Sequence, residues 1–115
     1  MPNYVFSYRS AKGYDALARP EDLAAWGDFL NKVIAPNVVD PGFPVFEPST
    51  VVGEAGEPTQ LGGYSIVTAD DLDAAVSMAK QCPTLSSGGG VEVGVLAALP
   101  PEHSAEQIRA RLSNA

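Results

Sequence analysis

Every second residue is apolar near the start of the chain. Across residues 3–9 the aromatic side chains of Tyr4, Phe6 and Tyr8 alternate with Val5 and Ser7. Successive side chains of a β-strand point to opposite faces, so this period predicts a strand over residues 3–9. Residues 10–18 are small or polar and predict a loop.

Three later segments also predict extended structure. Residues 62–68 and 91–99 alternate as strands do. Residues 43–52 are a weaker candidate, placed at a sheet edge because Pro44 and Pro48 lack the backbone N–H of a ladder donor. Taken together, the strands show two apolar sets: Tyr4, Phe6, Tyr64 and Ile66 on one face, and Val5 and Val67 on the other.

Helical spacing and capping residues predict three helices. The first begins at Pro20, carries its apolar stripe through Trp26, and ends at Pro36. The second opens on acidic residues at 70–73, which favour a helix N-terminus, and stops at Pro83. A short third helix follows residues 100–101, where Ser104 and Gln107 have the spacing of a capping box.

The resulting order is β-α-β-β-α-β with an additional C-terminal helix. This order predicts an α+β, ferredoxin-like domain with an antiparallel sheet over residues 3–99, and a C-terminal extension over residues 100–115. Two helices cover only one face of a four-stranded sheet. Because both faces carry apolar side chains, we expect a second copy of the chain to cover the other face, giving a homodimer.

Charge and composition exclude several classes of function. The chain has 115 residues, with 7 Lys plus Arg against 14 Asp plus Glu. A net charge of −7 disfavours nucleic acid as a partner. One His and one Cys leave no ligand set for a metal, and no cofactor motif is present. With no signal peptide and no long apolar run, we expect a cytoplasmic protein that does not contact membranes.

One succession of motifs resembles a known family. The stretches Leu61-Gly62-Gly63-Tyr64, Ala69-Asp70-Asp71-Leu72-Asp73, Cys82-Pro83 and Val91-Glu92-Val93 are similar to those of the YCII-related domain family. The resemblance covers about residues 3–99. It implies a dimeric α+β barrel, in which the sheets of two subunits pack face to face.

The chain departs from family signatures at two places. The DGPF motif of one large branch is missing between Val51 and Gln60. Some members also carry a His–Asp pair proposed as acid and base, but this chain has no histidine before His103. The resemblance therefore implies no residues for that chemistry here, and whether the protein is an enzyme stays open.

The end of the first strand is the best candidate for a ligand site. Arg9 follows the strand directly and has the planar fork that binds carboxylates and phosphates. A cleft is expected where the first helix returns over the sheet, with Tyr8, Trp26 and Tyr64 as apolar neighbours. Each of these residues has a structural alternative: a surface ion pair for Arg9, and the core for the three aromatic residues.

For the other residues that could carry chemistry, the sequence favours structural roles. We expect Cys82 to be a small buried thiol on the second helix, and His103 to be a solvated surface residue. The glycines at 88–90 precede a strand and predict a turn rather than a phosphate loop, whereas Gly62 and Gly63 predict a bulge or a close backbone approach. The remaining acidic candidates are assigned to a solvated loop (Glu54, Glu57) and to the start of the second helix (Asp70, Asp71, Asp73).

These observations favour a small-molecule binding protein. The expected ligand is a small metabolite, anionic or aromatic, bound between sheet and helices without a cofactor. Two alternatives are a cofactor-independent enzyme, with Arg9, Tyr8 and Asp70 polarising a substrate, and a protein–protein interaction module. A packed interior would favour the interaction module, and a polar cavity would favour the other two.

Overall fold

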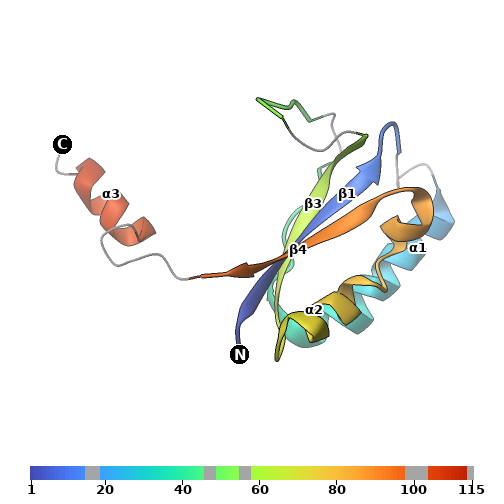
Figure 1. Ribbon diagram of the computed structural model, residues 1–115, viewed down its shortest axis with the longest axis horizontal. Coiled ribbons are helices and arrows are strands. Elements are labelled where there is room, and N and C mark those ends of the chain that lie inside the picture. Colours follow the sequence, from blue (N-terminus) through green and yellow to red (C-terminus); the bar gives the residue numbers. More distant parts are fainter. Residues whose placement is uncertain (15–18, 46–48, 55–57, 98–103, 114–115) are drawn as a thin grey trace.

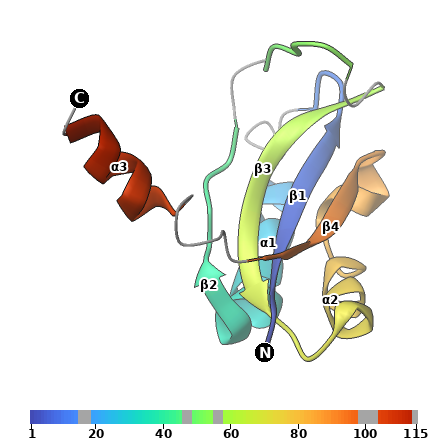
Figure 2. The ribbon, with the colours of Figure 1, turned by 60° about the vertical axis from the view of Figure 1, so that its left-hand side comes forward.

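A computed structural model describes residues 1–14, 19–45, 49–54, 58–97 and 104–113. A four-stranded antiparallel sheet in the order β2-β3-β1-β4 carries two helices on one face (Figures 1 and 2). The elements are β1 (Asn3–Ala11), α1 (Pro20–Phe29), β2 (Val38–Asp40), β3 (Thr59–Thr68), α2 (Leu72–Ala79), β4 (Gly90–Leu96) and α3 (Ala105–Ser113). The α+β, ferredoxin-like fold predicted from the element order is confirmed.

The register of β1 decides which side chains face the helices. Tyr4 pairs with Val67 and Phe6 with Ser65, while Val5 pairs with Ile66. Directly paired residues share a face, so Val67 joins Tyr4 and Phe6, and Ile66 joins Val5. The expected grouping of Tyr64 and Ile66 with Tyr4 and Phe6 is therefore wrong, because a strand's own alternation does not specify its register with the next strand.

The core lies between the sheet and the two helices. Tyr4, Phe6 and Tyr8 are almost fully buried there. They meet side chains of α1, α2 and the segments that follow each helix: Phe29, Ile34, Ala75, Ala79 and Cys82. The aromatic alternation of β1 therefore supplies most of the large core side chains.

The two covering helices begin as their sequences predict. Pro20 is the first residue of α1. The Asp71 carboxylate caps α2 by accepting a hydrogen bond of 2.8 Å from the backbone N–H of Ala74. Beyond α1 the chain continues as a π-helical turn, Leu30–Ile34, and a 3-10 turn, Ala35–Asn37, which places Ile34 in the core with 1% of its surface exposed.

The edge strand β2 differs from the expectation. It spans Val38–Asp40 and precedes the turn at Pro41-Gly42, whereas the sequence placed an extended edge segment after it. The Asp40 carboxylate accepts a hydrogen bond of 2.8 Å from the N–H of Gly42 and so stabilises this turn. Of the described residues in 43–52, only Pro44 joins the sheet, through one bridge to Gly63.

Two glycines of β3 fit this strand closely to its two neighbours, Gly62 to β1 and Gly63 to the edge segment. The register between β1 and β3 shifts between Tyr8 and Arg9, which leaves Gly62 as the extra residue of a bulge. Gly63 has φ +143°, and a Cβ there would lie 2.8 Å from the carbonyl oxygen of Phe43. The expectation of a bulge or a close approach at Gly62-Gly63 is confirmed.

The C-terminal helix stands apart from the sheet (Figure 2). The Ser104 hydroxyl caps α3 by accepting a hydrogen bond of 3.2 Å from the N–H of Gln107, as half of the predicted capping box. The last strand ends at Leu96, earlier than expected, and the helix that follows is exposed throughout. Across the ranges given above, no helix has the length and apolar character needed to cross a bilayer.

Two glycine-to-alanine variants should affect stability in opposite directions. A Cβ at Gly89 would overlap the Arg9 carbonyl and the Thr84 hydroxyl, so Gly89→Ala should lower the free energy of unfolding by about 2 kcal/mol. At Gly27 a Cβ meets nothing within 4 Å. Because alanine is the better helix former, Gly27→Ala should raise that free energy by up to about 1 kcal/mol. Urea unfolding measures both, and equal effects would contradict the described packing.

Candidate ligand cavity

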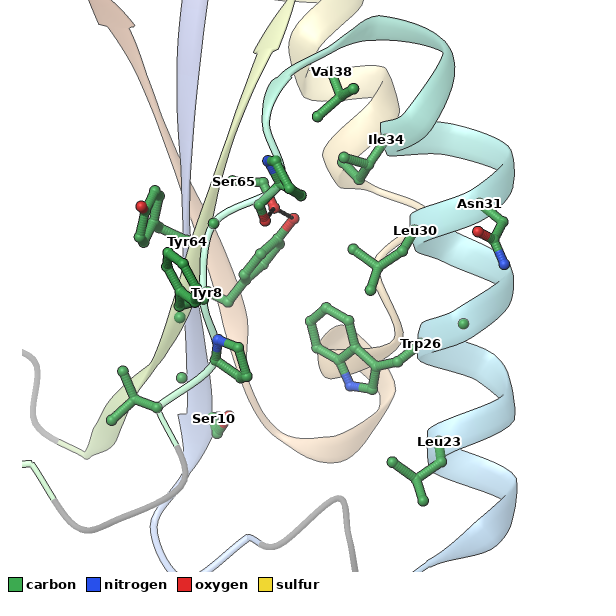
Figure 3. Close-up of a pocket in the computed structure, with 18 of the residues that line it drawn as sticks. Tyr8, Ser10, Leu23, Trp26, Leu30, Asn31, Ile34, Val38, Tyr64 and Ser65 are labelled. Carbon is green, nitrogen blue, oxygen red and sulfur yellow. Dashed lines mark hydrogen bonds between the residues drawn. The ribbon is translucent and has the colours of Figure 1, made fainter.

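A cavity of about 580 Å³ opens between α1, the sheet and the segment 38–45 (Figure 3). Its walls come from three parts of the chain that the fold brings together. β1 and the loop after it contribute Tyr8, Ser10 and Tyr14. Helix α1 and the turns after it contribute Leu23, Trp26, Gly27, Leu30, Asn31, Ile34 and Ala35. The sheet edge and β3 contribute Val38, residues 41–45, Gln60 and residues 62–65. The predicted cleft between helix and sheet is therefore present.

The helical wall is mainly apolar. Leu23, Trp26 and Leu30 recur at three- and four-residue spacing on one face of α1 and its continuation, and they point toward the sheet (Figure 3). Large apolar side chains around the cavity remain accessible: Leu23 is 45% exposed and Phe43 73%. Such a cluster of accessible apolar surface is typical of binding sites.

Three aromatic rings fix the inner end of this wall. The Tyr8 and Trp26 ring centroids are 5.1 Å apart, and Phe29 lies 6.2 Å from Tyr8 and 5.9 Å from Trp26. All three pairs meet edge to face, the arrangement that aromatic quadrupoles favour. The Tyr8 ring is therefore held rigidly at the cavity wall.

A short hydrogen-bond chain forms the buried polar part of the wall. The Tyr8 hydroxyl donates to the Ser65 hydroxyl at 2.9 Å, and Ser65 donates to the Pro41 carbonyl at 2.8 Å. Ser65 is fully buried and Tyr8 is 5% exposed. Burial, opposed in part by the Ser65 hydrogen bond, raises the pKa of Tyr8 to about 12, so Tyr8 stays a neutral phenol at neutral pH.

The structure brings together three of the four residues expected in the site. Tyr8, Trp26 and Tyr64 all line the cavity. Tyr64, however, pairs with Ser7 and not with Tyr8, so its side chain belongs to the other face of the sheet. Its hydroxyl donates to the Asp40 carboxylate at 3.1 Å, and this hydrogen bond, more than burial, raises the pKa of Tyr64.

Arg9 is not among the residues that line the cavity. It follows Tyr8 in β1, and neighbouring residues of a strand point to opposite faces. Its guanidinium donates from Nε to the Thr59 hydroxyl at 3.1 Å and from Nη2 to the Thr59 carbonyl at 2.9 Å. The structure therefore places the cation of the expected site across the sheet from the aromatic residues.

Three further candidates that the structure describes, Cys82, Asp70 and Glu54, do not line the cavity. Cys82 is a buried free thiol, as expected, and burial raises its pKa to about 11. Asp70 is exposed, as is Glu54. Glu57 and His103 lie outside the described residues. Within the described ranges, no three His, Cys, Asp or Glu side chains gather in a way that could hold a metal ion.

Ser65 and the apolar residues of segment 38–45 were not among the residues predicted for the site. The sequence did contain an indication of Ser65. Its hydroxyl is the one side-chain hydroxyl among residues 63, 65 and 67, which share the buried face of β3. A buried hydroxyl needs a partner, and the nearest aromatic strand offered tyrosines. Val38 and Phe43 had no such signal, because their approach depends on the turn at Pro41-Gly42.

Comparison with known proteins identifies the family. Residues 9–98 match the YCII-related domain, and the chain therefore belongs to the YCII-related domain family. No curated protein matches the sequence.

A solved structure shares the fold. It is the 5-chloro-2-hydroxyhydroquinone dehydrochlorinase of Burkholderia phenoliruptrix AC1100 in complex with 2,5-dihydroxybenzoquinone, with a TM-score of 0.55 and 18% identity. The likeness covers 89% of this chain and 98% of the dehydrochlorinase. At this identity the comparison supports the fold.

The raised pKa of Tyr8 predicts a loss of stability in alkali. Between pH 10 and about 12 the unfolded chain releases the Tyr8 proton while the folded chain retains it, so the free energy of unfolding falls as pH rises. Urea unfolding across this range should show a shallower fall in Tyr8→Phe than in the parent protein. Parallel curves would mean that the Tyr8 phenol ionises as freely in the folded state as in the unfolded state.

Proposed function

We propose that this protein binds a small aromatic molecule in the cavity between α1 and the sheet. The observation that carries the proposal is a 580 Å³ cavity with accessible apolar walls and one buried pair of hydroxyls. Small-ligand sites have this size, and they combine apolar walls with a few placed polar groups. The volume accommodates a molecule of one or two rings.

The wall chemistry favours an aromatic ligand over an anionic one. Trp26 and Tyr8 offer ring faces and edges, whereas the described lining residues carry no charged side chain. Arg9, the cation expected to hold an anion, bonds Thr59 instead. The bound 2,5-dihydroxybenzoquinone of the dehydrochlorinase, a single-ring compound, supports a ligand of similar size here.

Binding is favoured over catalysis by where the candidate catalytic groups lie. The enzymatic alternative needed Arg9, Tyr8 and Asp70 around one substrate. Only Tyr8 lines the cavity, and Asp70 is exposed just before α2. Tyr8 stays protonated at neutral pH, so it serves as a hydrogen-bonding group rather than a base.

Filling the cavity should abolish binding without unfolding the protein. Gly27 lines the cavity and has open space at its Cβ position, so Gly27→Leu should place a leucine side chain in the ligand volume. Titrations of single-ring and two-ring aromatic compounds, followed by the fluorescence of Trp26, should show saturable quenching in the parent chain and a loss of affinity of about tenfold or more in Gly27→Leu.

Ala24→Leu provides the matched control. Ala24 is an exposed residue of α1 that does not line the cavity, so the same leucine there should leave affinity unchanged. Equal binding by Gly27→Leu and the parent chain would place the ligand elsewhere.

We also propose that two copies associate through the uncovered face of the sheet. On this face Val5 lies between Ile66 and Gly94, its direct partners on the two neighbouring strands. Helices α1 and α2 pack on the other face only (Figure 2). The dimeric barrel implied by the family resemblance buries this face against its symmetric equivalent, as an isologous interface requires.

Light scattering at micromolar concentration should give about twice the 12.0 kDa chain mass. Ile66→Lys places a charge in the centre of the proposed interface and should give a folded monomer, because an unpaired buried charge is costly. Val52→Lys, at a residue that is 95% exposed, should remain a dimer. A monomeric parent chain, or a dimeric Ile66→Lys variant, would contradict this interface.

A further inference from the structure

We propose that the cavity recognises a neutral aromatic ligand through a group that donates a hydrogen bond, such as a ring hydroxyl, to the Tyr8 hydroxyl oxygen. This inference rests on the proposed function and specifies the ligand's polarity. It follows from the direction of the hydrogen bonds at the wall and from the charges around it.

The direction of the chain Tyr8–Ser65–Pro41 is fixed by its last member. A backbone carbonyl only accepts, so the single hydroxyl proton of Ser65 is committed to the Pro41 oxygen, 2.8 Å away. The contact of 2.9 Å between the Tyr8 and Ser65 hydroxyls must then use the proton of Tyr8. The hydroxyl protons of Tyr8 and Ser65 are therefore both used within the protein, and the Tyr8 oxygen offers a ligand only its lone pairs.

The three members are held in place independently of any ligand. Ser65 pairs with Phe6 in the centre of the sheet and is fully buried. Pro41 belongs to the turn that the Asp40 carboxylate stabilises through the N–H of Gly42. Trp26 and Phe29 pack against the Tyr8 ring. The arrangement therefore presents a preformed acceptor rather than a hydroxyl that turns to suit either kind of ligand.

The charges near the cavity favour a neutral ligand. The described lining residues include neither a cation nor an anion. Burial raises the pKa of Tyr14 at the cavity wall, and the neighbouring Asp22 carboxylate, whose Oδ2 lies 4.0 Å from Nε of Arg19, adds to this shift. The Asp40 carboxylate accepts a hydrogen bond from Tyr64. A chain of net charge −7 disfavours an anion, and none of the described lining residues supplies a cation to hold one.

Two probes test the acceptor, and the second carries a methyl group in place of the hydroxyl hydrogen of the first. The 15N-labelled full chain is titrated at pH 7 with p-cresol and with 4-methylanisole, following the indole N–H signal of Trp26, the one tryptophan in the sequence. The methoxy compound cannot donate a hydrogen bond. We expect p-cresol to bind about five- to tenfold more tightly, the net effect of one hydrogen bond. The additional methyl group of 4-methylanisole favours burial, so it acts against the expected order.

Ser65→Ala should change the preference for p-cresol over 4-methylanisole and not merely weaken the binding of both compounds. Without Ser65 the Tyr8 proton loses its acceptor and becomes available to a ligand, so 4-methylanisole should gain affinity relative to p-cresol and the ratio should fall to about one or below. Tyr8→Phe removes the acceptor itself and should lower the affinity for p-cresol while leaving that for 4-methylanisole nearly unchanged. A purely structural role of these residues would weaken both probes together.

The charge requirement has its own probe, 4-methylbenzoate, an anion at pH 7, which should bind more weakly than p-cresol. Equal or tighter binding of 4-methylanisole or 4-methylbenzoate by the parent chain would overturn the inference while leaving the cavity as the ligand site. Absence of any shift with all three probes would contradict the proposed function, and the inference with it.

Discussion

The pairing of Tyr8 with Gly63 is the constraint on which the rest of the site depends. A side chain at Gly63 would meet the backbone of Phe43 and Pro44, so glycine is needed for the edge segment to pair this closely beside β3. Gly62, the residue before Gly63, forms the bulge at which the ladder between β1 and β3 shifts register. Gly63 thus allows the segment 41–45 to lie against β3, and that segment forms one wall of the cavity.

The same pairing gives the two faces of the sheet different chemistry. Tyr8 turns toward α1, where aromatic packing and the Ser65 hydroxyl hold its ring and its proton. Arg9, one residue later, turns to the uncovered face and bonds Thr59. An acidic protein therefore keeps this cation out of its cavity, and the cavity is left to recognise shape, aromatic surface and hydrogen-bond direction.

Local features of the fold could be predicted, whereas relations between strands could not. The alternation in β1 and the acidic start of α2 act within a few residues, and the sequence shows both. The grouping of Tyr64 with Tyr4 failed because register is a contact between distant segments, and a shift of one residue exchanges the faces. The edge strand was misplaced for a similar reason, since a three-residue strand, Val38–Asp40, carries too little periodicity to recognise. For the site, the cleft and its aromatic residues Tyr8 and Trp26 were predictable, whereas the side chain of Tyr64 lies on the other face of the sheet. The separation of Arg9 from Tyr8 was implicit in the strand period, and the Ser65 chain needed the three-dimensional structure.

A crystal structure of the protein soaked with p-cresol would show where a phenol binds. We expect the ring between Trp26 and segment 41–45, with the ligand hydroxyl within hydrogen-bonding distance of the Tyr8 oxygen, about 2.5–3.0 Å. Density for p-cresol on the uncovered face beside Val5 or Arg9, with the cavity holding only water, would contradict this expectation.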